Sequence, residues 1–387
     1  MNILEVNDKK NIKEFLDFPN RLYKNDPNWI PHLRQDIEKV FDKKTNKYFR
    51  HGEAIRWILK DNENKTIGRI AAFINQKTSK GFKQPTGGIG FFECINNQEA
   101  AFCMFDTAKK WLEDRGMEAM DGPINFGEKD KYWGLVTQNF TAPPYYCQNY
   151  NPEYYVPFFE NYGFKVYYEQ YIYSRNTTDE LAEVLIDKAN RIAKNPAYTF
   201  KTIDKSDLYK YAEDFRIIYN RAWVKHEAFK SMEHKQAMTI MKTIKPILDE
   251  DLIHFAYYND VPVGFFIALP EINQIFKRIG DNFNWWGKLK FVVYQKLGVM
   301  DTFFGLAFGI DPAHQGKGLE GALFNSIKKQ VAIKNKYKDV VITWIGDFNP
   351  KMIHVIENLG AEKLRTLCTY RYLFDREKPF ERTKVIT

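Results

Sequence analysis

The stretch Gln315-Gly316-Lys317-Gly318-Leu319-Glu320-Gly321 is the most informative part of this chain of 387 residues. It follows an apolar run, residues 302–310, and a turn that contains Pro312. It opens a segment whose apolar residues recur at helical spacing. A strand, a glycine-rich turn and a helix together present backbone N–H groups and the positive end of a helix to an anion. Because the spacings GxGxxG and GxxxxGK[ST] are absent, we expect a different kind of anion site.

An internal repeat organises the chain. Two predicted β-hairpins, each made of two apolar strands and a polar turn, contain a glycine at the same point, Gly68 and Gly264. Two helical stretches that open on Asn-Pro each end on a glycine, Gly163 and Gly360. The two glycine pairs have nearly the same separation along the chain. This indicates two copies of one domain, which we call the first copy and the second copy.

The repeat predicts the domain organisation. Each copy has the order strand, helices, hairpin, strand, helix, strand, helix, strand, which is a mixed α/β order. We expect one domain over residues 1–175 and a second over residues 197–387. Between them, Asn176-Thr177-Thr178 is typical of a helix start, so residues 176–196 are predicted to form a connector helix.

The second copy resembles the GNAT superfamily of acyl-CoA N-acyltransferases. Its Q-x-x-G-x-E-G stretch is similar to the pyrophosphate loop Q/R-x-x-G-x-G/A of that family, with Glu320 in place of the third small residue. The resemblance implies a fold of two tandem GNAT-like domains with mixed α+β sheets, and the whole chain is similar to an uncharacterised bacterial tandem-GNAT family. In the first copy, residues 95–100 contain an acid and no glycine. The resemblance therefore implies a degenerate first copy that no longer binds CoA.

The resemblance also implies an acyl-CoA co-substrate and the residues that bind it, with no metal. The pantetheine arm would pair with the backbone of residues 308–310, the pyrophosphate would meet the loop, and an asparagine would lie near the arm. These residues are Phe308, Gly309, Ile310, Gln315, Gly316, Lys317, Gly318, Leu319, Gly321 and Asn349. Two simpler interpretations stay open: the glycines can serve tight packing alone, and Asn349 before Pro350 can be a helix N-cap.

Glu320 leaves the loop with two possible states. A carboxylate in the first turn of a helix is stabilised by the helix dipole and repels a diphosphate. Either Glu320 points outward and the backbone still binds CoA, or it occupies the anion site. We favour the first state because the glycines and Lys317 would otherwise have no use.

Acyl transfer from a thioester to an amine needs a proton acceptor for the amine and a proton donor for the leaving thiolate. In many GNAT proteins the donor is a tyrosine four residues before the helix-ending glycine, where this chain has Ile356 and Phe159. The nearby candidates for catalysis are Asp347, His354 and Tyr370. Asp347 can instead belong to a turn, and His354 to a solvated helix face.

The bulk composition limits the partners. The net charge of +8 suits an anionic ligand such as CoA, an acidic membrane surface or nucleic acid, but no block of Lys and Arg favours nucleic acid. The four cysteines form no C-x-x-C pair, so reduced thiols in a cytoplasmic protein are expected. Neither a secretory signal nor a run of about 18 apolar residues is evident.

Three further features leave more than one interpretation open. Residues 271–297 form a helical, aromatic and basic insertion that either contacts a membrane or covers a pocket, or packs between the domains. The aromatic loops of residues 122–146 either build the acceptor side of a site shared by the copies or seal the degenerate copy. Glu93, at the end of a predicted strand, is either an inward base or a cap.

The leading hypothesis is an acyl-CoA-dependent N-acyltransferase, transferring an acetyl group to the amine of a small molecule or peptide, with its cofactor site in the second copy. A second hypothesis is a non-catalytic binding protein that keeps the fold and has lost CoA binding. A third is a tRNA-dependent aminoacyltransferase of tandem-GNAT type, which the basic charge permits. The sequence leaves the acceptor, the acyl-chain length and the oligomeric state open.

Overall fold

The computed structural model describes residues 1–222 and 231–386. The elements of the first copy follow the predicted order. They are β1 (Asn2–Glu5), α1 (Lys9–Leu22), α2 (Arg34–Phe41), β2 (Gly52–Lys60), β3 (Thr66–Asn75), α3 (Gln76–Ser79), β4 (Thr86–Cys94), α4 (Gln98–Glu113), β5 (Ala119–Gly122), β6 (Leu135–Gln138), α5 (Tyr155–Tyr162) and β7 (Lys165–Asn176).

The second copy repeats this order with an inserted helix pair. Its elements are α6 (Glu183–Ala193), β8 (Tyr198–Thr202), α7 (Leu208–Ala222), α8 (His234–Ile244), β9 (Ile253–Tyr258), β10 (Val261–Pro270), α9 (Asn273–Ile279), α10 (Trp285–Lys296), β11 (Thr302–Ile310), α11 (Leu319–Lys334), β12 (Asp339–Gly346), α12 (Pro350–Asn358) and β13 (Glu362–Leu373).

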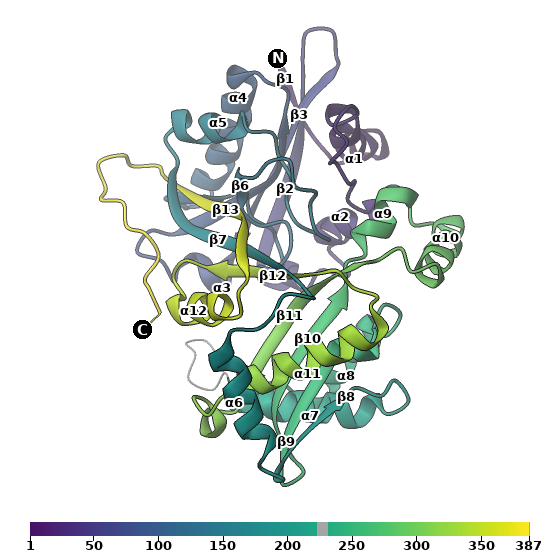
Figure 1. Ribbon diagram of the computed structural model, residues 1–387. Coiled ribbons are helices and arrows are strands. Elements are labelled where there is room, and N and C mark those ends of the chain that lie inside the picture. Colours follow the sequence, from purple (N-terminus) through teal and green to yellow (C-terminus); the bar gives the residue numbers. More distant parts are fainter. Residues whose placement is uncertain (223–230, 387) are drawn as a thin grey trace.

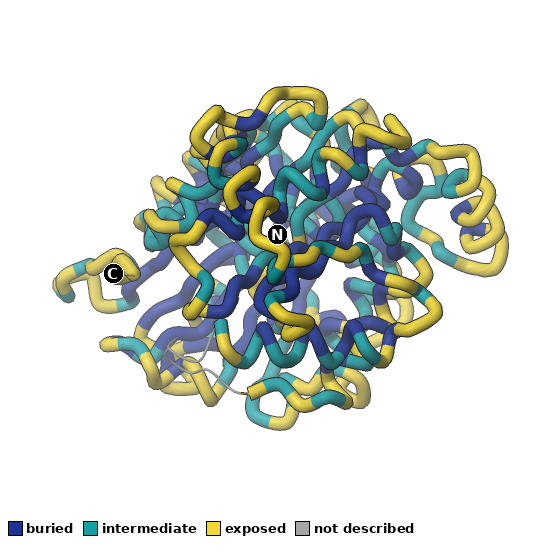
Figure 2. The backbone as a smooth tube through the Cα atoms, turned by 60° about the horizontal axis from the view of Figure 1, so that its bottom comes forward, coloured by how far each residue is buried: buried dark blue, intermediate teal, exposed yellow. Residues whose placement is uncertain are grey.

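The strands of both copies join into one mixed sheet that runs through the molecule (Figure 1). The strand order is β1-β2-β3-β4-β5-β13-β7-β12-β11-β10-β9-β8, and β6 pairs with β13 outside this path. Helices cover both faces of each half, and the backbone is buried mainly along the strands (Figure 2). The predicted mixed α/β fold with tandem copies is confirmed.

The two copies exchange their last strands. β13, the end of the second copy, pairs with β5 of the first copy, from Tyr370 opposite Gly122 to Leu373 opposite Ala119. β7, the end of the first copy, pairs with β12 of the second, where Ile342 faces Tyr173. The exchanged strands also pair with each other at the centre. The sheet is therefore continuous because each copy completes the other.

The exchanged strands also contribute side chains to the hydrophobic core of the other copy. Cys368, Tyr370 and Tyr372 of β13 are buried in the core of the first copy, together with the apolar faces of α4 and α5. Tyr173 of β7 is buried in the second copy against Ile342 and the residues of α12. Burial of such aromatic side chains stabilises a protein by about 2–3 kcal/mol each. Each core is thus completed by side chains of the other copy's last strand.

The predicted helix ends are confirmed, but the connector is shorter than expected. Gly163 and Gly360 follow α5 and α12 with φ of 107° and 72°, the left-handed conformation that glycine adopts without strain. The connector helix does not begin at Asn176, because α6 starts only at Glu183. The amide of Asn176 is bound by the Asp179 side chain, and the guanidinium of Arg175 binds the Asp179 carbonyl. These contacts favour a turn over a helix start.

The insertion of residues 271–297 folds as the helix pair α9 and α10 and packs against the first copy. Ile275, Phe276 and Phe291 of the pair bury themselves against Ile30 and Leu33. This confirms the helical prediction and the packing between copies. The outer side of α10 is exposed.

A buried carboxylate fastens the start of this insertion. Oε1 of Glu271 accepts hydrogen bonds from the backbone N–H of Tyr146 at 3.1 Å and of Asn273 at 2.9 Å. Its Oε2 is buried without a hydrogen-bond partner. Burial raises the pKa of Glu271 from 4.5 to about 7. Between these two values the folded protein binds a proton that the unfolded chain releases, so this carboxyl makes stability fall as the pH rises.

We therefore expect Glu271→Gln to change the pH dependence of stability. The amide keeps the acceptor for both N–H groups and cannot ionise. Relative to the unaltered protein, the free energy of unfolding should rise by about 3 kcal/mol between pH 4.5 and pH 8. Urea denaturation of both proteins at the two pH values measures this. A difference between them that does not change with pH would contradict the prediction.

Candidate functional site

β11 and β12 separate halfway along their length. They are parallel neighbours only over Thr302–Gly305, which faces Asp339–Ile342. β11 continues to Ile310 and stays paired with β10 on its other side. Along residues 306–310 the edge towards β12 therefore has no strand partner, and Leu306 is 42% exposed. An extended ligand can pair with such an edge as an added strand.

The open edge leads to the predicted anion loop. After β11, a short turn and Gln315 precede Gly318, which is the N-cap of α11 with φ of 95° and provides no capping side chain. The side chain of Gln315 donates from Nε2 to the carbonyl of Ile310 at 3.0 Å, which holds the loop against the strand end. The first N–H groups of α11 thus have no side-chain cap. Such an arrangement binds anions.

At two of the three loop glycines, close packing against a neighbouring helix leaves no room for a side chain. A Cβ on Gly318 would lie 2.7 Å from Cβ of Lys188, and one on Gly321 would lie 3.1 Å from the carbonyl of Leu185. Both neighbours belong to α6, which lies directly on α11. Gly316 differs, because nothing lies within 4 Å of its Cβ position and only its φ of 72° requires glycine. The packing interpretation therefore holds for Gly318 and Gly321 and not for Gly316.

Two residues of distant elements lie beside the loop. Lys188 contacts Gly318, and Nη1 of Arg221 pairs with Oδ2 of Asp311 at 3.0 Å. Lys317 is exposed in the loop itself. Burial, followed by the charges of Lys317 and Arg221, lowers the pKa of His314. Sequence reasoning missed Lys188 and Arg221 because they come from α6 and α7, far from the loop along the chain.

The two remaining loop residues lie at the start of α11. Leu319 is the first residue of this helix and is fully buried in the core beneath it. Glu320 lies in the first turn and is partly buried. Asn349 caps α12, because its Oδ1 accepts the backbone N–H of Met352 at 3.2 Å. Asn349 therefore acts as the helix N-cap, which was one of its two interpretations.

The three candidates for catalysis do not lie together. Asp347 follows β12, where its Oδ2 pairs with Nη2 of Arg382 and its Oδ1 is buried without a hydrogen-bond partner. Burial raises the pKa of Asp347, and the charge of Arg382 opposes this. His354 is exposed on α12. Tyr370 lies in the core of the first copy, where its hydroxyl donates to Oε1 of Glu160 at 3.1 Å.

A small cavity of mixed polar and apolar lining lies where the copies meet, next to β12. It encloses about 260 Å³ of empty space, open solvent included. Oε1 of Gln148, Oε1 of Gln170 and Nε1 of Trp344 have no hydrogen-bond partner although they are buried. Trp344 also has a φ of 64°, which is uncommon for a bulky residue. The cavity is lined by Asp130, Tyr132, Trp133, Cys147, Gln148, Gln170, Ile172, Trp344 and Leu367.

A larger apolar pocket lies between α11 and the sheet. It encloses about 520 Å³ of empty space, open solvent included. Two of its lining residues, Phe303 and Ile342, lie on β11 and β12 near the point where these strands separate. Its lining is Arg175, Thr177, Leu181, Phe266, Phe303, Phe324, Ile327, Lys328, Val331, Val340, Ile342 and Leu359. An alkyl chain that continued from the open edge would meet apolar side chains here.

The equivalent gap in the first copy is filled. β4 and β5 pair over three residues, and the chain then turns back so that Ile124 donates its N–H to the carbonyl of Ile89 at 2.7 Å. A Cβ on Gly90 would lie 1.8 Å from the carbonyl of Ile124. The start of α4 is capped by Asn97, whose Oδ1 accepts the N–H of Ala100 at 2.9 Å. Because the gap is filled and the helix is capped, neither is available to a cofactor.

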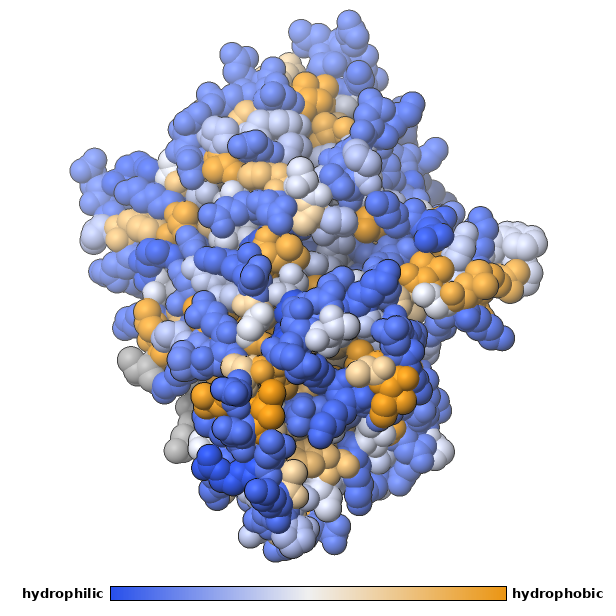
Figure 3. All heavy atoms as spheres, in the orientation of Figure 1, coloured by the Kyte–Doolittle hydropathy of each residue, from blue (hydrophilic) through white to orange (hydrophobic). Residues whose placement is uncertain are grey.

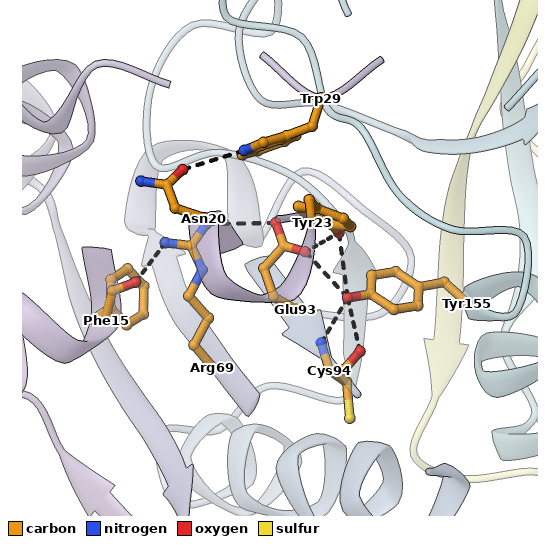
Figure 4. A network of polar contacts seen from close by, with 8 residues as sticks. All are labelled: Phe15, Asn20, Tyr23, Trp29, Arg69, Glu93, Cys94 and Tyr155. Atoms are coloured by element: carbon orange, nitrogen blue, oxygen red, sulfur yellow. Dashed lines mark hydrogen bonds and ion pairs between the residues drawn. The ribbon is translucent and has the colours of Figure 1, made fainter. Parts of the chain in front are cut away.

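Glu93 lies in a buried network beside this filled gap and is not a cap (Figure 4). Its Oε2 accepts hydrogen bonds from the hydroxyls of Tyr23 and of Tyr155, the latter at 3.1 Å. Its Oε1 lies 3.5 Å from Nη2 of Arg69, which also donates from Nη1 to the carbonyl of Phe15 at 2.8 Å. Burial raises the pKa of Glu93, and Arg69 opposes this.

Within residues 1–222 and 231–386, no cluster of three or more His, Cys, Asp or Glu side chains is suited to a metal ion. All four cysteines are free. Over the same residues, no helix combines the length and apolar composition that crossing a bilayer requires.

Comparisons with known proteins agree with this architecture. No family model matches the sequence. The chain is 25% identical over 386 residues to the bacterial ceramide synthase of Caulobacter vibrioides, covering 96% of this chain and 97% of that protein. It is 23% identical over 367 residues to protein YghO of Escherichia coli K12, covering 94% and 93%.

A solved tandem GNAT protein from the clavulanic acid biosynthesis pathway superimposes with a TM-score of 0.54 at 10% identity, covering 97% of this chain and 99% of that one. At this identity the likeness concerns the fold. The chain therefore has the fold of a tandem GNAT protein.

Proposed function

We propose that the protein is an acyl-CoA-dependent N-acyltransferase whose cofactor site lies in the second copy. The observation that carries this proposal is the unpaired edge of β11, which leads directly to the uncapped N-terminus of α11. An arm with amide groups can pair with the edge, and a diphosphate can accept hydrogen bonds from the helix start. Lys317 in the loop and Arg221 beside Asp311 add positive charge around that anion.

The cofactor contacts follow from this placement. The backbone of Phe308, Gly309 and Ile310 pairs with the pantetheine arm. The N–H groups of residues 315–321 receive the pyrophosphate. Asn349 contributes by fixing the start of α12 beside the gap, since its side chain is already bound to Met352.

Two observations favour a long acyl chain over the acetyl group expected from the sequence. The lining of the apolar pocket under α11 includes Phe303 and Ile342, which lie on β11 and β12 next to the point where these strands separate. The Caulobacter relative is named a ceramide synthase, and a ceramide is a long-chain amino alcohol with a fatty acyl group on its nitrogen. We propose a fatty acyl-CoA donor and a long-chain amine acceptor. The unpartnered oxygens of Gln148 and Gln170 are suited to accept hydrogen bonds from amine or hydroxyl groups of that acceptor.

The chemistry is a nucleophilic substitution at the thioester. The amine nitrogen attacks the carbonyl carbon, a C–N bond forms, the C–S bond breaks, and the thiolate of CoA leaves. Asp347 is the proposed proton acceptor for the amine, because its Oδ1 has no partner and its pKa is raised. His354 and Tyr370 are not placed to assist it directly. The remaining rate acceleration comes from holding the two substrates in the reactive geometry.

Calorimetry with palmitoyl-CoA, acetyl-CoA and free CoA tests the cofactor site. We expect all three to bind, and palmitoyl-CoA to bind most tightly. Mass spectrometry of a mixture of palmitoyl-CoA and a long-chain amino alcohol should then show the N-acylated product. A folded protein that binds none of the three ligands would refute the proposal.

The second candidate is a binding protein that has lost CoA. The close packing of α6 on Gly318 and Gly321 favours it, because this packing gives two of the loop glycines a purpose without a ligand. If Glu320 occupies the anion site, Glu320→Gly should create CoA affinity in a protein that otherwise shows none. Binding of CoA to the unaltered protein decides against this candidate.

A further inference from the structure

The outer face of α10 is apolar and exposed. Trp285, Trp286 and Leu289 are 66%, 63% and 46% exposed, and the face continues through Val292, Val293 and Leu297 at 47%, 46% and 70%. Because an α-helix turns about 100° per residue, these six side chains fall within an arc of about 140°. The opposite side, with Gly287 and Phe291, is buried against the protein. The outward-facing side of a surface helix normally carries charged and polar residues.

The helix protrudes from the body of the protein (Figure 1). Figure 3 shows its hydrophobic side chains gathered on this protrusion, surrounded by hydrophilic residues. α10 lies away from the gap between β11 and β12 and does not cover the loop of residues 315–321. These side chains therefore have no role in covering the proposed cofactor site.

The charges around this face have one sign. Lys288, Lys290 and Lys296 are exposed on α10, and the sequence from Trp285 to Lys296 contains no acidic residue. The last turn of α9 adds Lys277 and Arg278. Tryptophans, large aliphatic residues and lysines on the exposed side of a helix are the features of helices that lie in the interfacial region of a membrane. The lysines match the anionic headgroups, and the apolar arc matches the acyl boundary.

The base of the helix pair is held rigidly to the first copy. Nε of Arg34 pairs with Oδ2 of Asp281 at 2.7 Å, and Nδ2 of Asn20 donates to the same carboxylate at 2.7 Å. The backbone N–H of Arg34 also donates to the carbonyl of Asp281 at 3.1 Å. Insertion of α10 would therefore fix the orientation of the whole protein and not of a loose arm.

We infer that α10 docks the protein onto the surface of an anionic phospholipid bilayer, with its axis in the membrane plane and its apolar arc among the upper acyl chains. Docking is a property of the surface alone and does not depend on the proposed acyl transfer. It would bring a water-soluble enzyme to substrates that reside in the bilayer.

Co-sedimentation with vesicles tests the inference. We expect the full chain to bind vesicles of phosphatidylcholine mixed with phosphatidylglycerol, and to bind pure phosphatidylcholine more weakly. The double variant Leu289→Glu/Val292→Glu should bind the mixed vesicles at least about ten-fold more weakly. The matched control is Val184→Glu/Ile333→Glu, because these residues are apolar and 63% and 75% exposed on α6 and α11. It receives the same charge change and should bind like the unaltered protein.

A second measurement needs no charged substitution. Brominated lipids in the mixed vesicles should quench the tryptophan fluorescence of the unaltered protein, and Trp285→Phe/Trp286→Phe should lose most of this quenching. Absence of binding and of quenching overturns the inference, as does equal loss of binding in both glutamate variants. A dimer in sedimentation velocity that Leu289→Glu/Val292→Glu dissolves, without vesicle binding, would assign the face to a second copy of the chain instead. None of these readouts needs acyl-CoA, so a failure here leaves the proposed activity untouched.

Discussion

Replacement of Gly316 by Asp is expected to weaken the binding of palmitoyl-CoA by about ten- to thirty-fold, which corresponds to about 1.4–2 kcal/mol. Gly316 lies in the loop between β11 and α11, is exposed, and has open space around its Cβ position. The new carboxylate would lie among the N–H groups proposed for the pyrophosphate. Two like charges a few ångströms apart repel by more than this at the effective dielectric constant of a protein surface, and salt screens part of it.

Gly116 provides the matched control for this experiment. Its φ of 76° is close to the 72° of Gly316, and nothing lies within 4 Å of its Cβ position either. Gly116→Asp therefore has the same backbone strain and the same added charge in the first copy, after α4. Calorimetry should give an unchanged affinity for this control. If both variants bind palmitoyl-CoA like the unaltered protein, the pyrophosphate does not lie at this loop.

Replacement of Asp121 by Ala is expected to lower the free energy of unfolding by about 3–5 kcal/mol. The carboxylate of Asp121 in β5 forms two bonds with Arg371 in β13, Oδ1 to Nε at 2.6 Å and Oδ2 to Nη2 at 2.8 Å. The side chains are 10% and 6% exposed. The alanine would leave a buried guanidinium without its counter-ion, at the contact between the exchanged strand and the first copy.

Two controls separate this effect from a general loss of charge. Glu381→Gln removes the exposed ion pair with Lys83, whose side chains are 62% and 61% exposed, and should cost much less than Asp121→Ala because solvent screens the pair. Asp121→Ala/Arg371→Met removes both charges and should recover much of the lost stability. Urea denaturation followed by circular dichroism measures all three. A cost for Asp121→Ala as small as that for Glu381→Gln would show that the pair does not stabilise the exchange.

The local elements could be predicted from the sequence because each has a short-range signature. The hairpins around Gly68 and Gly264 and the helix ends at Gly163 and Gly360 lie where the repeat placed them. The exchange of β7 and β13 could not be predicted. Both strands end equivalent copies with similar patterns, and the choice between the two positions in the sheet depends on contacts such as that of Asp121 with Arg371.

The candidate site was predictable in part for the same reason. The loop and the strand before it are contiguous in sequence, whereas Lys188 and Arg221 reach the loop through packing of α6 and α7. Glu93 was recognised as a possible inward acid, but its partners Tyr23 and Arg69 come from other elements. For residues 271–297 the sequence left a membrane contact and a buried helix pair open, because aromatic and basic residues fit both until the solvent exposure of α10 is known.

The exchange of strands has a consequence for synthesis of the chain. Between β5 and its neighbour β13 lies the entire second copy apart from this strand itself. On the ribosome, the first copy therefore emerges with an open sheet edge and cannot complete its core until the second copy has been made. Domains usually fold in the order in which they emerge, and an unpaired edge is prone to wrong association. The two halves of this protein must instead finish together, so neither is expected to be stable when expressed alone.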